Sequence, residues 1–291
     1  MVQDTALVLE GGGMRGIYTG GVLDFFMEKN IRFPYTIGVS AGACNGSSLI
    51  SNQPGRNKQV NIGFIHDPRY LSFRNFITKR EMFGMDFLFD EIPNIHVPFD
   101  FETFFASSEE FVIGTTDVHS GKSVYFGKND YTKESILPII RASSSLPLMA
   151  PIVKVDGFEL LDGGIVDPIP TNKARIDGYE KQVLILTRES HYRKKPSKFS
   201  SLLKTSYRKY PALVKAIQQR YKLYNDTMDE IEERERAGEL FVIRPTRTME
   251  VKRIDRNEKR LESLYEQGYN DAKEKYKELL DFVNMKPVLN R

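Results

Sequence analysis

The sequence has little cysteine, little histidine and no long apolar run. Cys44, which we expect to be a buried apolar residue, is the single cysteine among 291 residues. No disulfide can therefore form within the chain, and a reducing compartment is favoured. Nowhere do about 18 apolar residues follow one another, so the sequence predicts no membrane-spanning helix. Histidine, cysteine and acidic residues nowhere show the spacing of metal ligands, and we expect neither a metal nor another cofactor.

The rest of the composition is that of a globular protein. Hydrophobic residues make up 40% of the chain, charged residues make up 28%, and the formal net charge is only +3. A chain of this length and hydrophobic content can bury a sufficient core without disulfides. So small a net charge gives no reason to expect a nucleic-acid partner. The first residues lack a charged leader followed by an apolar segment, which predicts a cytoplasmic protein.

The most informative motif is G-V-S-A-G at residues 38–42, directly after a short apolar strand. G-x-S-x-G between a strand and a helix is the pattern of a nucleophile elbow, in which a sharp turn exposes the serine. Gly38 and Gly42 leave room for that turn. A helix beginning at Ala41 would direct its free N–H groups and positive dipole end toward Ser40. Ser40 is therefore our candidate nucleophile for attack on an ester carbonyl.

A glycine cluster lies between the first predicted strand and an amphipathic helix. Gly11, Gly12 and Gly13 leave their N–H groups unshielded, and Arg15 adds a positive charge nearby. Such a loop can receive the negative oxygen of a tetrahedral intermediate, which makes it a candidate oxyanion hole.

The same cluster has a second interpretation. Gly11, Gly13 and Gly16 fit the G-x-G-x-x-G fingerprint of a Rossmann-type dinucleotide site. That site requires an acidic residue about 20 residues further on, at the end of the second strand. The second strand ends in Val39-Ser40 instead. We favour the oxyanion hole and keep the dinucleotide-binding enzyme as an alternative.

A serine nucleophile needs a base, and Asp162 is the best candidate. It ends the apolar strand 158–161 and precedes a double glycine. A strand terminus is the usual place for a catalytic side chain on a parallel sheet. An aspartate that caps local N–H groups in a turn is an equally good interpretation. The order Ser40, Asp162, His191 would also fit an α/β-hydrolase triad, although that fold usually has more strands before its elbow. The four histidines lie in no motif: His66, His96, His119 and His191.

Together these motifs resemble those of the patatin-like phospholipase family. The likeness rests on G-G-G-M-R-G at 11–16, G-V-S-A-G at 38–42, D-G-G at 162–164 and the segment R-A-S-S-S-L-P at 141–147. It covers residues 5 to about 190 and, more loosely, 240–285. One difference is that Asp-Pro-Ile-Pro follows the D-G-G motif where many members carry Asn-x-Pro, so the resemblance does not define the acyl pocket.

The resemblance implies a serine–aspartate dyad without histidine. Ser40 would be the nucleophile and Asp162 the general base, and an acyl-enzyme would form on a phospholipid, lysophospholipid or neutral lipid ester without calcium. Gly11, Gly12, Gly13 and Arg15 would form the oxyanion loop. A non-catalytic lipid-binding protein that keeps the fold remains a further alternative.

Alternating strands and helices predict a three-layer α/β/α sandwich with a central, mostly parallel sheet. A hairpin is expected around residues 119–122, and a final helix between residues 261 and 280 should pack on the sheet. The predicted strands are Ala6–Glu10, Tyr35–Val39, Glu110–Thr116, Ser123–Phe126, Phe158–Leu161, Val183–Thr187 and Leu240–Ile243.

A basic helical insertion is expected at residues 191–238, between a catalytic core at 1–190 and a C-terminal strand and helix at 239–291. Ten lysines and arginines and no acidic residue lie between Arg193 and Lys222, and apolar residues recur at helical spacing after Pro211. One interpretation is a lid or a contact with an anionic membrane through residues 193–224. The other is an apolar stripe that packs on the domain, with its lysines in solvent.

Overall fold

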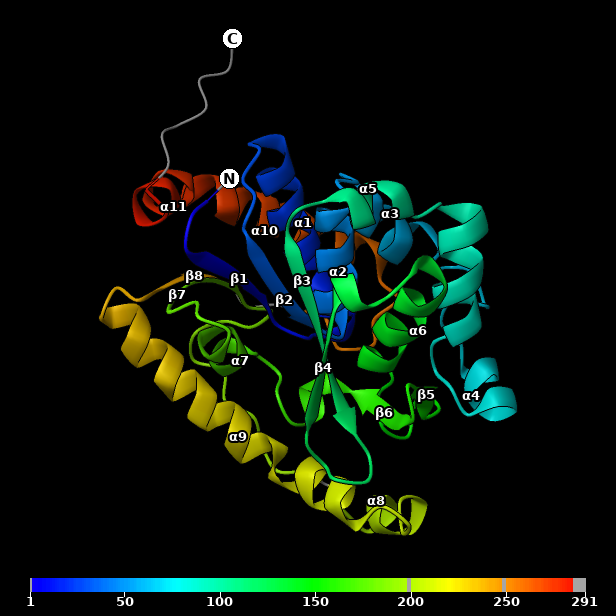
Figure 1. The fold of residues 1–291 in the computed structure, drawn as a ribbon. Coiled ribbons are helices and arrows are strands. Elements are labelled where there is room, and N and C mark those ends of the chain that lie inside the picture. Colours follow the sequence, from blue (N-terminus) through cyan, green and yellow to red (C-terminus); the bar gives the residue numbers. More distant parts are fainter. Residues whose placement is uncertain (1, 198–199, 248–249, 285–291) are drawn as a thin grey trace.

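The computed structural model describes residues 2–197, 200–247 and 250–284. Its centre is an eight-stranded sheet with strand order β5-β6-β3-β2-β1-β7-β8, in which β4 pairs with β3 outside this path. The predicted α/β/α sandwich is confirmed (Figure 1). The strands are β1 Thr5–Leu9, β2 Tyr35–Val39, β3 Glu110–Asp117, β4 Ser123–Gly127, β5 Val153–Val155, β6 Phe158–Asp162, β7 Lys181–Ile185 and β8 Leu240–Ile243.

Five neighbouring strands of the sheet run parallel, in the order β3, β2, β1, β7 and β8. The antiparallel pairings are those of β4, β5 and β6. The hairpin around residues 119–122 is confirmed as the β3–β4 connection. The seven predicted strands are all present, with ends displaced by up to two residues. The strand that was missed, β5, has three residues, too few for an alternating pattern to stand out.

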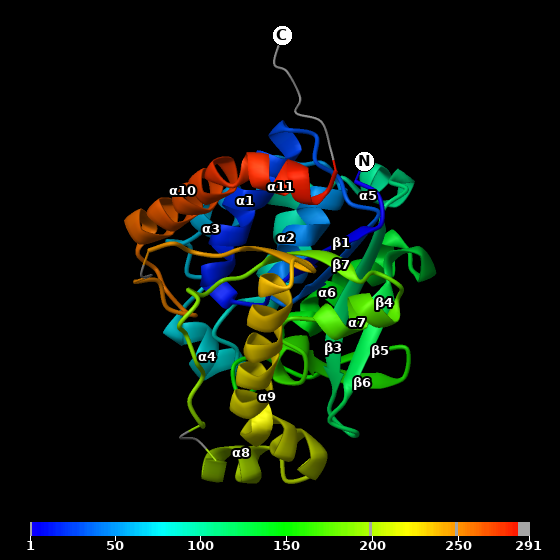
Figure 2. The ribbon, with the colours of Figure 1, turned by 90° about the vertical axis from the view of Figure 1, so that its left-hand side faces the viewer.

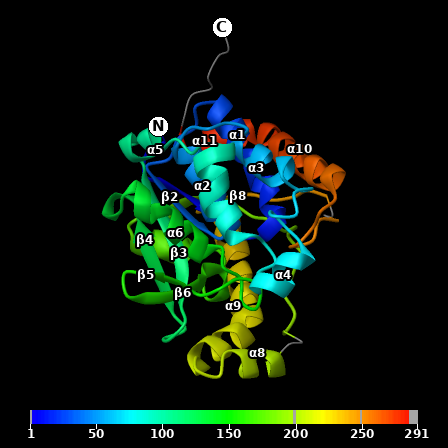
Figure 3. The ribbon, with the colours of Figure 1, turned by 90° about the vertical axis from the view of Figure 1, so that its right-hand side faces the viewer.

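Helices cover both faces of the sheet (Figures 2 and 3). Leu7 and Leu9 of β1 pack toward α1 and α10, whereas Ala6 and Val8 pack toward α7 and α9. Because both faces are buried, β1 reads as a continuous apolar run, as strands of parallel sheets do. The helices are α1 Ile17–Glu28, α2 Ala41–Ile50, α3 Arg56–Gly63, α4 Phe73–Lys79, α5 Phe101–Ala106, α6 Lys133–Ser143, α7 Thr171–Ile176, α8 Ser200–Ser206, α9 Pro211–Arg236, α10 Glu258–Glu274 and α11 Tyr276–Phe282.

The C-terminal helix differs from the prediction in two respects. It is divided into α10 and α11 at Lys275, and α10 packs mainly on α1 rather than directly on the sheet. The two helices approach through glycine: a Cβ added to Gly21 would lie 2.0 Å from the carbonyl oxygen of Tyr265, and one added to Gly268 would lie 2.1 Å from that of Tyr18. Two glycines facing each other's backbone therefore place α10 in an outer layer over α1.

The basic insertion forms α8 and α9, and α9 runs along the face of the sheet that α7 also covers (Figure 1). The apolar stripe of α9 is buried against the domain, with Leu213, Tyr224, Met228 and Ile231 each at most 1% exposed. Most of this stripe therefore packs on the domain, whereas Ile217 and Tyr221 are partly exposed, and a lid or membrane contact stays a prediction. Within the described ranges, no helix has the length and apolar character needed to cross a bilayer.

Candidate active site

Ser40 occupies a strained turn between β2 and α2. Its φ of 56° and ψ of −124° lie in a region that side-chain-bearing residues rarely adopt. Its N–H group donates to Ser143 Oγ at 2.8 Å, and that hydroxyl donates in turn to the carbonyl of Gly114 at 2.7 Å. Ser143 belongs to the 141–147 segment, so this segment fixes the elbow. Sequence reasoning had singled out the segment without assigning it that contact.

The elbow glycines are required by close backbone approach. A Cβ on Gly38 would lie 2.7 Å from the carbonyl of Gly42, and a Cβ on Gly42 would lie 2.4 Å from the carbonyl oxygen of Leu9. Both distances are shorter than real contacts allow, so a side chain at either position would move α2 away from the strands. The G-x-S-x-G pattern therefore has the structural basis expected of it.

The pairing register of β3 brings Ser40 and Asp162 together. β4 occupies one edge of β3 along Val112–Thr116. β2 and β6 must therefore share the other edge, where Val39 pairs with Gly114 and Asp162 pairs with the next residue, Thr115. β6 is antiparallel to β3, so Asp162 ends an antiparallel strand of this mostly parallel sheet. Because of that reversal, the carboxyl ends of β2 and β6 meet head to head.

Asp162 is 2% exposed and only partly hydrogen-bonded. Its N–H group donates to the carbonyl of Ser145 at 2.8 Å, and its Oδ1 accepts from the N–H of Gly164 at 2.7 Å. Oδ2 is buried and has no partner within the described part of the chain. No hydrogen bond to Ser40 Oγ is present there either. The carboxylate thus makes the local turn contact of a capping aspartate and keeps one oxygen free beside the elbow.

The N–H groups of the glycine loop differ in their partners. That of Gly11 donates to the carbonyl of Pro168 at 3.3 Å. Among the residues that the structure describes, those of Gly12 and Gly13 have no partner. Arg15 is 6% exposed, and its Nε also lacks a partner there. Burial, together with the charges of neighbouring arginines, lowers its pKa to about 10. The loop therefore offers two backbone donors and one buried guanidinium.

The dinucleotide interpretation of this loop is disfavoured by its packing. A Cβ on Gly12 would lie 2.8 Å from Thr187 Oγ1, and one on Gly13 would lie 2.6 Å from the carbonyl oxygen of Arg253. The N–H of Met14 already donates to that carbonyl at 3.0 Å. Close packing against Thr187 and Arg253 thus accounts for Gly12 and Gly13 without a bound dinucleotide.

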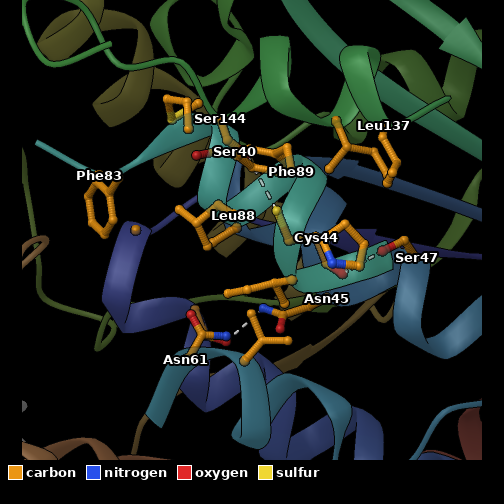
Figure 4. Close-up of a pocket in the computed structure, with 18 of the residues that line it drawn as sticks. Ser40, Cys44, Asn45, Ser47, Asn61, Phe83, Leu88, Phe89, Leu137 and Ser144 are labelled. Carbon is orange, nitrogen blue, oxygen red and sulfur yellow. Dashed lines mark hydrogen bonds between the residues drawn. The ribbon is translucent and has the colours of Figure 1, made fainter. Parts of the chain in front are cut away.

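Ser40 lines a cavity of about 120 Å³. In the view of Figure 4, Ser40 and Ser144 lie at one end of the cavity and Asn61 at the other, with Leu88 between them. Since Ser40 is only 6% exposed, substrate would reach its hydroxyl through this cavity. Most of the wall is apolar: Met14, Val60, Tyr70, Phe83, Met85, Leu88, Phe89, Ile92, Pro93, Phe99, Leu137, Ile140 and Leu146.

Much of that wall comes from a segment that sequence reasoning missed. Residues Phe87–His96 form a π-helix, η2, with Pro93 inside it, and four of its residues line the cavity. Such helices are rare and are often found at functional sites. The available signal was the concentration of apolar residues between 82 and 93, which has no regular period. The Asp167–Pro170 segment, which differs from the family pattern, is not among the lining residues described.

Cys44 and Arg220 also lie near Ser40 and Asp162. Cys44 is partly exposed in the cavity wall, 3.4 Å from Ser144 Oγ, and burial raises the pKa of its thiol. Arg220 reaches in from α9, and its Nε donates to the carbonyl of Gly164. Burial lowers the pKa of Arg220 to about 10, while the charge of Asp162 acts in the opposite direction. The helical insertion therefore contributes a side chain to the site, which no motif had indicated.

None of the four histidines lines the cavity in the described structure. His66 pairs with Glu258 and His119 pairs with Glu159 at exposed positions. His96 packs against two phenylalanine rings of the core, and His191 is exposed. The four histidines thus lie away from the cavity that Ser40 lines, whereas strand pairing places the carboxylate of Asp162 at the elbow.

Comparison with known proteins identifies the family. The model of the patatin-like phospholipase family matches residues 7–175, more than half of the chain. This chain belongs to the patatin-like phospholipase family. The patatin-like match contains the glycine loop, the elbow and Asp162. A second model, a domain of unknown function (DUF6363), matches residues 210–284 and so joins α9 to the C-terminal elements.

Matches to two known proteins extend beyond residues 7–175 of this chain. The chain is 32% identical over 257 residues to the uncharacterized protein YjjU of Escherichia coli (strain K12), a match covering 84% of this chain and 69% of YjjU. The crystal structure of VipD from Legionella pneumophila matches with a TM-score of 0.57 at 13% identity, covering 96% of this chain and 66% of that chain. The likeness to VipD shows the fold. The chain spans about two thirds of the length of each relative.

Proposed function

We propose that this protein is a serine lipid acyl hydrolase of the phospholipase A or lysophospholipase type. The observation that carries the proposal is the shared edge of β3, where a strained Ser40 and a buried Asp162 come from strands that meet end to end. The apolar cavity that begins at Ser40 supports a substrate with a fatty acyl chain. Membership of the patatin-like family supports the same reaction class.

The proposed mechanism gives a role to each polar group of the site that lacks a hydrogen-bond partner in the described structure. Ser40 Oγ attacks the ester carbonyl, and the free Oδ2 of Asp162 accepts its proton. The unpaired N–H groups of Gly12 and Gly13 hold the developing oxyanion, and Arg15 adds positive charge. As the tetrahedral intermediate collapses, the ester C–O bond breaks and Asp162 passes the proton to the leaving alkoxide, which departs as the alcohol. The acyl-enzyme keeps its chain in the cavity until Asp162 takes a proton from a water, whose attack releases the fatty acid and returns the proton to Ser40. The N–H of Gly11 is already bonded to Pro168, so we assign that glycine to the shape of the loop.

The resting structure has no hydrogen bond between Ser40 and Asp162, which is the one observation favouring a non-catalytic lipid-binding protein. Catalytic hydrogen bonds often tighten only when substrate is bound, and the open Oδ2 leaves room for that contact. Turnover therefore separates the two functions, because a binding protein hydrolyses no ester.

The test is covalent labelling together with turnover. A fluorophosphonate probe followed by peptide mapping should label Ser40, and Ser40→Ala should abolish both labelling and hydrolysis of a short-chain nitrophenyl ester. Ser206→Ala, at an exposed position of α8, is the matched control and should retain both. Labelling of another residue, or unchanged hydrolysis by Ser40→Ala, would contradict the proposal.

Contact with an anionic membrane through residues 193–224 is part of the proposal as well. The exposed Lys204, Lys215 and Lys222 support it, because cations near an anionic bilayer surface each contribute about 1 kcal/mol of attraction. The buried part of the apolar stripe of α9 contributes nothing to such a contact.

A further inference from the structure

Five basic side chains gather around the glycine loop. Arg15 belongs to the loop, Arg188 follows β7, Lys194 precedes α8, Arg220 comes from α9 and Arg253 precedes α10. Their charges act on one another. After burial, repulsion by Arg188 and Arg253 is the largest cause lowering the pKa of Arg15. Burial and then Arg220 and Arg253 lower the pKa of Lys194 to about 6, so its amine is largely neutral at pH 7 and the four arginines carry the positive charge. The rings of Tyr192 and Tyr224, which lie against Arg188 and Lys194, contact each other edge to face with their centres 5.8 Å apart, so these side chains belong to one cluster.

No carboxylate neutralises this cluster by a direct ion pair. In the part of the chain that the structure describes, no side-chain nitrogen of these five residues lies within 4.0 Å of a carboxylate oxygen. Glu10 is near, but its Oε1 accepts from the hydroxyl of Tyr224 at 3.1 Å and its Oε2 accepts from Thr187. Asp162 also acts on Arg220 through its charge. Positive charge remains in excess.

Aromatic rings lie against two of the five side chains. The guanidinium of Arg188 lies 4.2 Å from the ring centre of Tyr192, and Nζ of Lys194 lies 3.9 Å from that of Tyr224. A ring face attracts a cation without accepting all of its N–H groups. Arg15 and Arg188 each keep a buried Nε with no described partner, and Arg15 is 6% exposed. Buried donors of this kind call for a ligand.

We propose that Arg15, Arg188, Lys194, Arg220 and Arg253 form a binding site for a phosphoryl group. Guanidinium groups match phosphate oxygens in charge and geometry. None of the five lines the acyl cavity, yet Met14 lines that cavity while its N–H donates to the carbonyl of Arg253 at 3.0 Å. A lipid with its acyl chain in the cavity would thus place a phosphorylated headgroup at the cluster. Four of the five residues lie outside the matched range 7–175. The link to turnover rests on the proposed function.

The first test measures binding alone. Inorganic phosphate is titrated calorimetrically into Ser40→Ala protein, into the same protein carrying R188Q/R253Q, and into a control carrying K215Q/K222Q on the exposed side of α9. The dissociation constant should rise roughly tenfold or more in R188Q/R253Q, because charge-assisted hydrogen bonds are lost. It should change less than twofold in the control. Lys194→Gln provides a milder variant if the double variant fails a circular dichroism check of folding.

The second test separates a lipid headgroup from free phosphate. Initial rates are compared for a lysophosphatidate and a monoacylglycerol with the same acyl chain in mixed micelles. A wild-type preference for the phosphorylated substrate that falls roughly tenfold in R188Q/R253Q identifies the headgroup as ligand. Phosphate binding that the double variant weakens, without any such preference, supports the site for a soluble phosphoryl ligand. If neither readout responds to R188Q/R253Q, the site is wrong. If neither ester is hydrolysed, the proposed function fails while the titration still decides the site.

A separate surface lies on α4. Phe73 and Ile77 are 67% and 70% exposed, and Phe76 lies beside them with its ring centre 5.9 Å from that of Phe73. Arg74 and Arg80 flank these apolar residues, and residues 68–80 contain no acidic side chain. The segment also reaches the acyl cavity, because Leu71 pairs with Phe83 in a short bridge and Phe83 lines the cavity.

We infer that α4 inserts its apolar side chains into an anionic lipid surface. Apolar residues flanked by cations suit the interface of a bilayer with negative headgroups. The test is cosedimentation with vesicles of phosphatidylglycerol and phosphatidylcholine. F73S/I77S should lose most of the bound fraction, whereas Ile176→Ser should not, although Ile176 on α7 is equally exposed at 70%. Equal binding by F73S/I77S, no binding by the wild type, or a change in oligomeric state upon F73S/I77S would each overturn the inference.

Discussion

Ser40 keeps its unusual backbone conformation because neighbouring groups hold it. One hydroxyl, Ser143 Oγ, accepts from the N–H of Ser40 and donates to the carbonyl of Gly114, the residue that pairs with Val39 at the end of β2. The next serine but one in the chain, Ser145, accepts the N–H of Asp162. A single segment therefore positions both members of the proposed dyad, which gives the serine-rich motif a physical role.

Ser143→Ala should destabilise the protein by about 2 kcal/mol, because it leaves two buried backbone groups without their partner. Ester turnover should fall as well, since the elbow can relax. Urea unfolding and initial rates measure the two effects. Ser51→Ala is the control, because Ser51 is buried, its hydroxyl bonds only to its neighbours Ser48 and Gln53 among the described residues, and it is not among those that line the cavity. Equal effects of the two substitutions would show that Ser143 has no special part in the elbow.

Single replacement of each histidine by alanine should leave most hydrolysis intact. None of the four lines the described cavity, and an aspartate base needs no imidazole. Initial rates on a nitrophenyl ester test this. A collapse of activity in His191→Ala alone would indicate a three-residue triad instead.

The titration of Asp167 should make stability depend on pH. Burial raises its pKa to about 6, and the hydroxyl of Tyr125 donates to it and limits the rise. Since the pKa is higher in the folded than in the unfolded state, this group's contribution to the free energy of unfolding declines as pH rises from about 4 to 6. Asp167→Asn removes that decline. The free energy of unfolding of the variant, relative to that of the wild type, should therefore rise by up to about 3 kcal/mol between pH 4 and 7. Urea unfolding at several pH values measures it, and a pH-independent difference would contradict it.

At the scale of elements, the local sequence predicted where single strands and helices lie. It did not predict features that depend on how one element packs or pairs with another. The strand before Asp162 was recognised, but its antiparallel direction was not, because direction depends on which edge of β3 is free. The cavity wall was missed because η2 has no helical period of apolar residues. Arg220 was missed because its place beside Gly164 depends on how α9 crosses the domain.

The contact of α10 with α1 depends on two glycines that sequence reasoning left unexplained. Gly268→Ala should separate the helices, because its Cβ would lie 2.1 Å from the carbonyl oxygen of Tyr18. We expect a loss of about 1–3 kcal/mol, the usual cost of overpacking. Gly63→Ala, at the end of α3, has only one contact at 3.9 Å and should be neutral or slightly stabilising. Thermal unfolding of both variants decides, and equal melting temperatures would contradict the argument.

For the whole molecule, the residues that carry the proposed chemistry and those that support them lie far apart in the chain. The proposed dyad and glycine loop belong to the first 175 residues. The other side of the same core comes from the C-terminal part: α10 packs on α1, β8 pairs with β7, and the carbonyl of Arg253 holds the N–H of Met14. The division at residues 190 and 238 stays a prediction, but these contacts make the first part dependent on the last.

A fragment of residues 1–190 should therefore fail to fold, although it contains every residue of the proposed mechanism. Without β8 the edge of β7 would be open for pairing with other chains. Without α10 the surface of α1 around Gly21 would lose the helix that packs on it. The full chain should unfold in one cooperative transition by circular dichroism and by tyrosine fluorescence, whereas the fragment should aggregate or give no transition. A soluble fragment that unfolds cooperatively and still reacts with a fluorophosphonate at Ser40 would show that the C-terminal part is an addition to an independent enzyme.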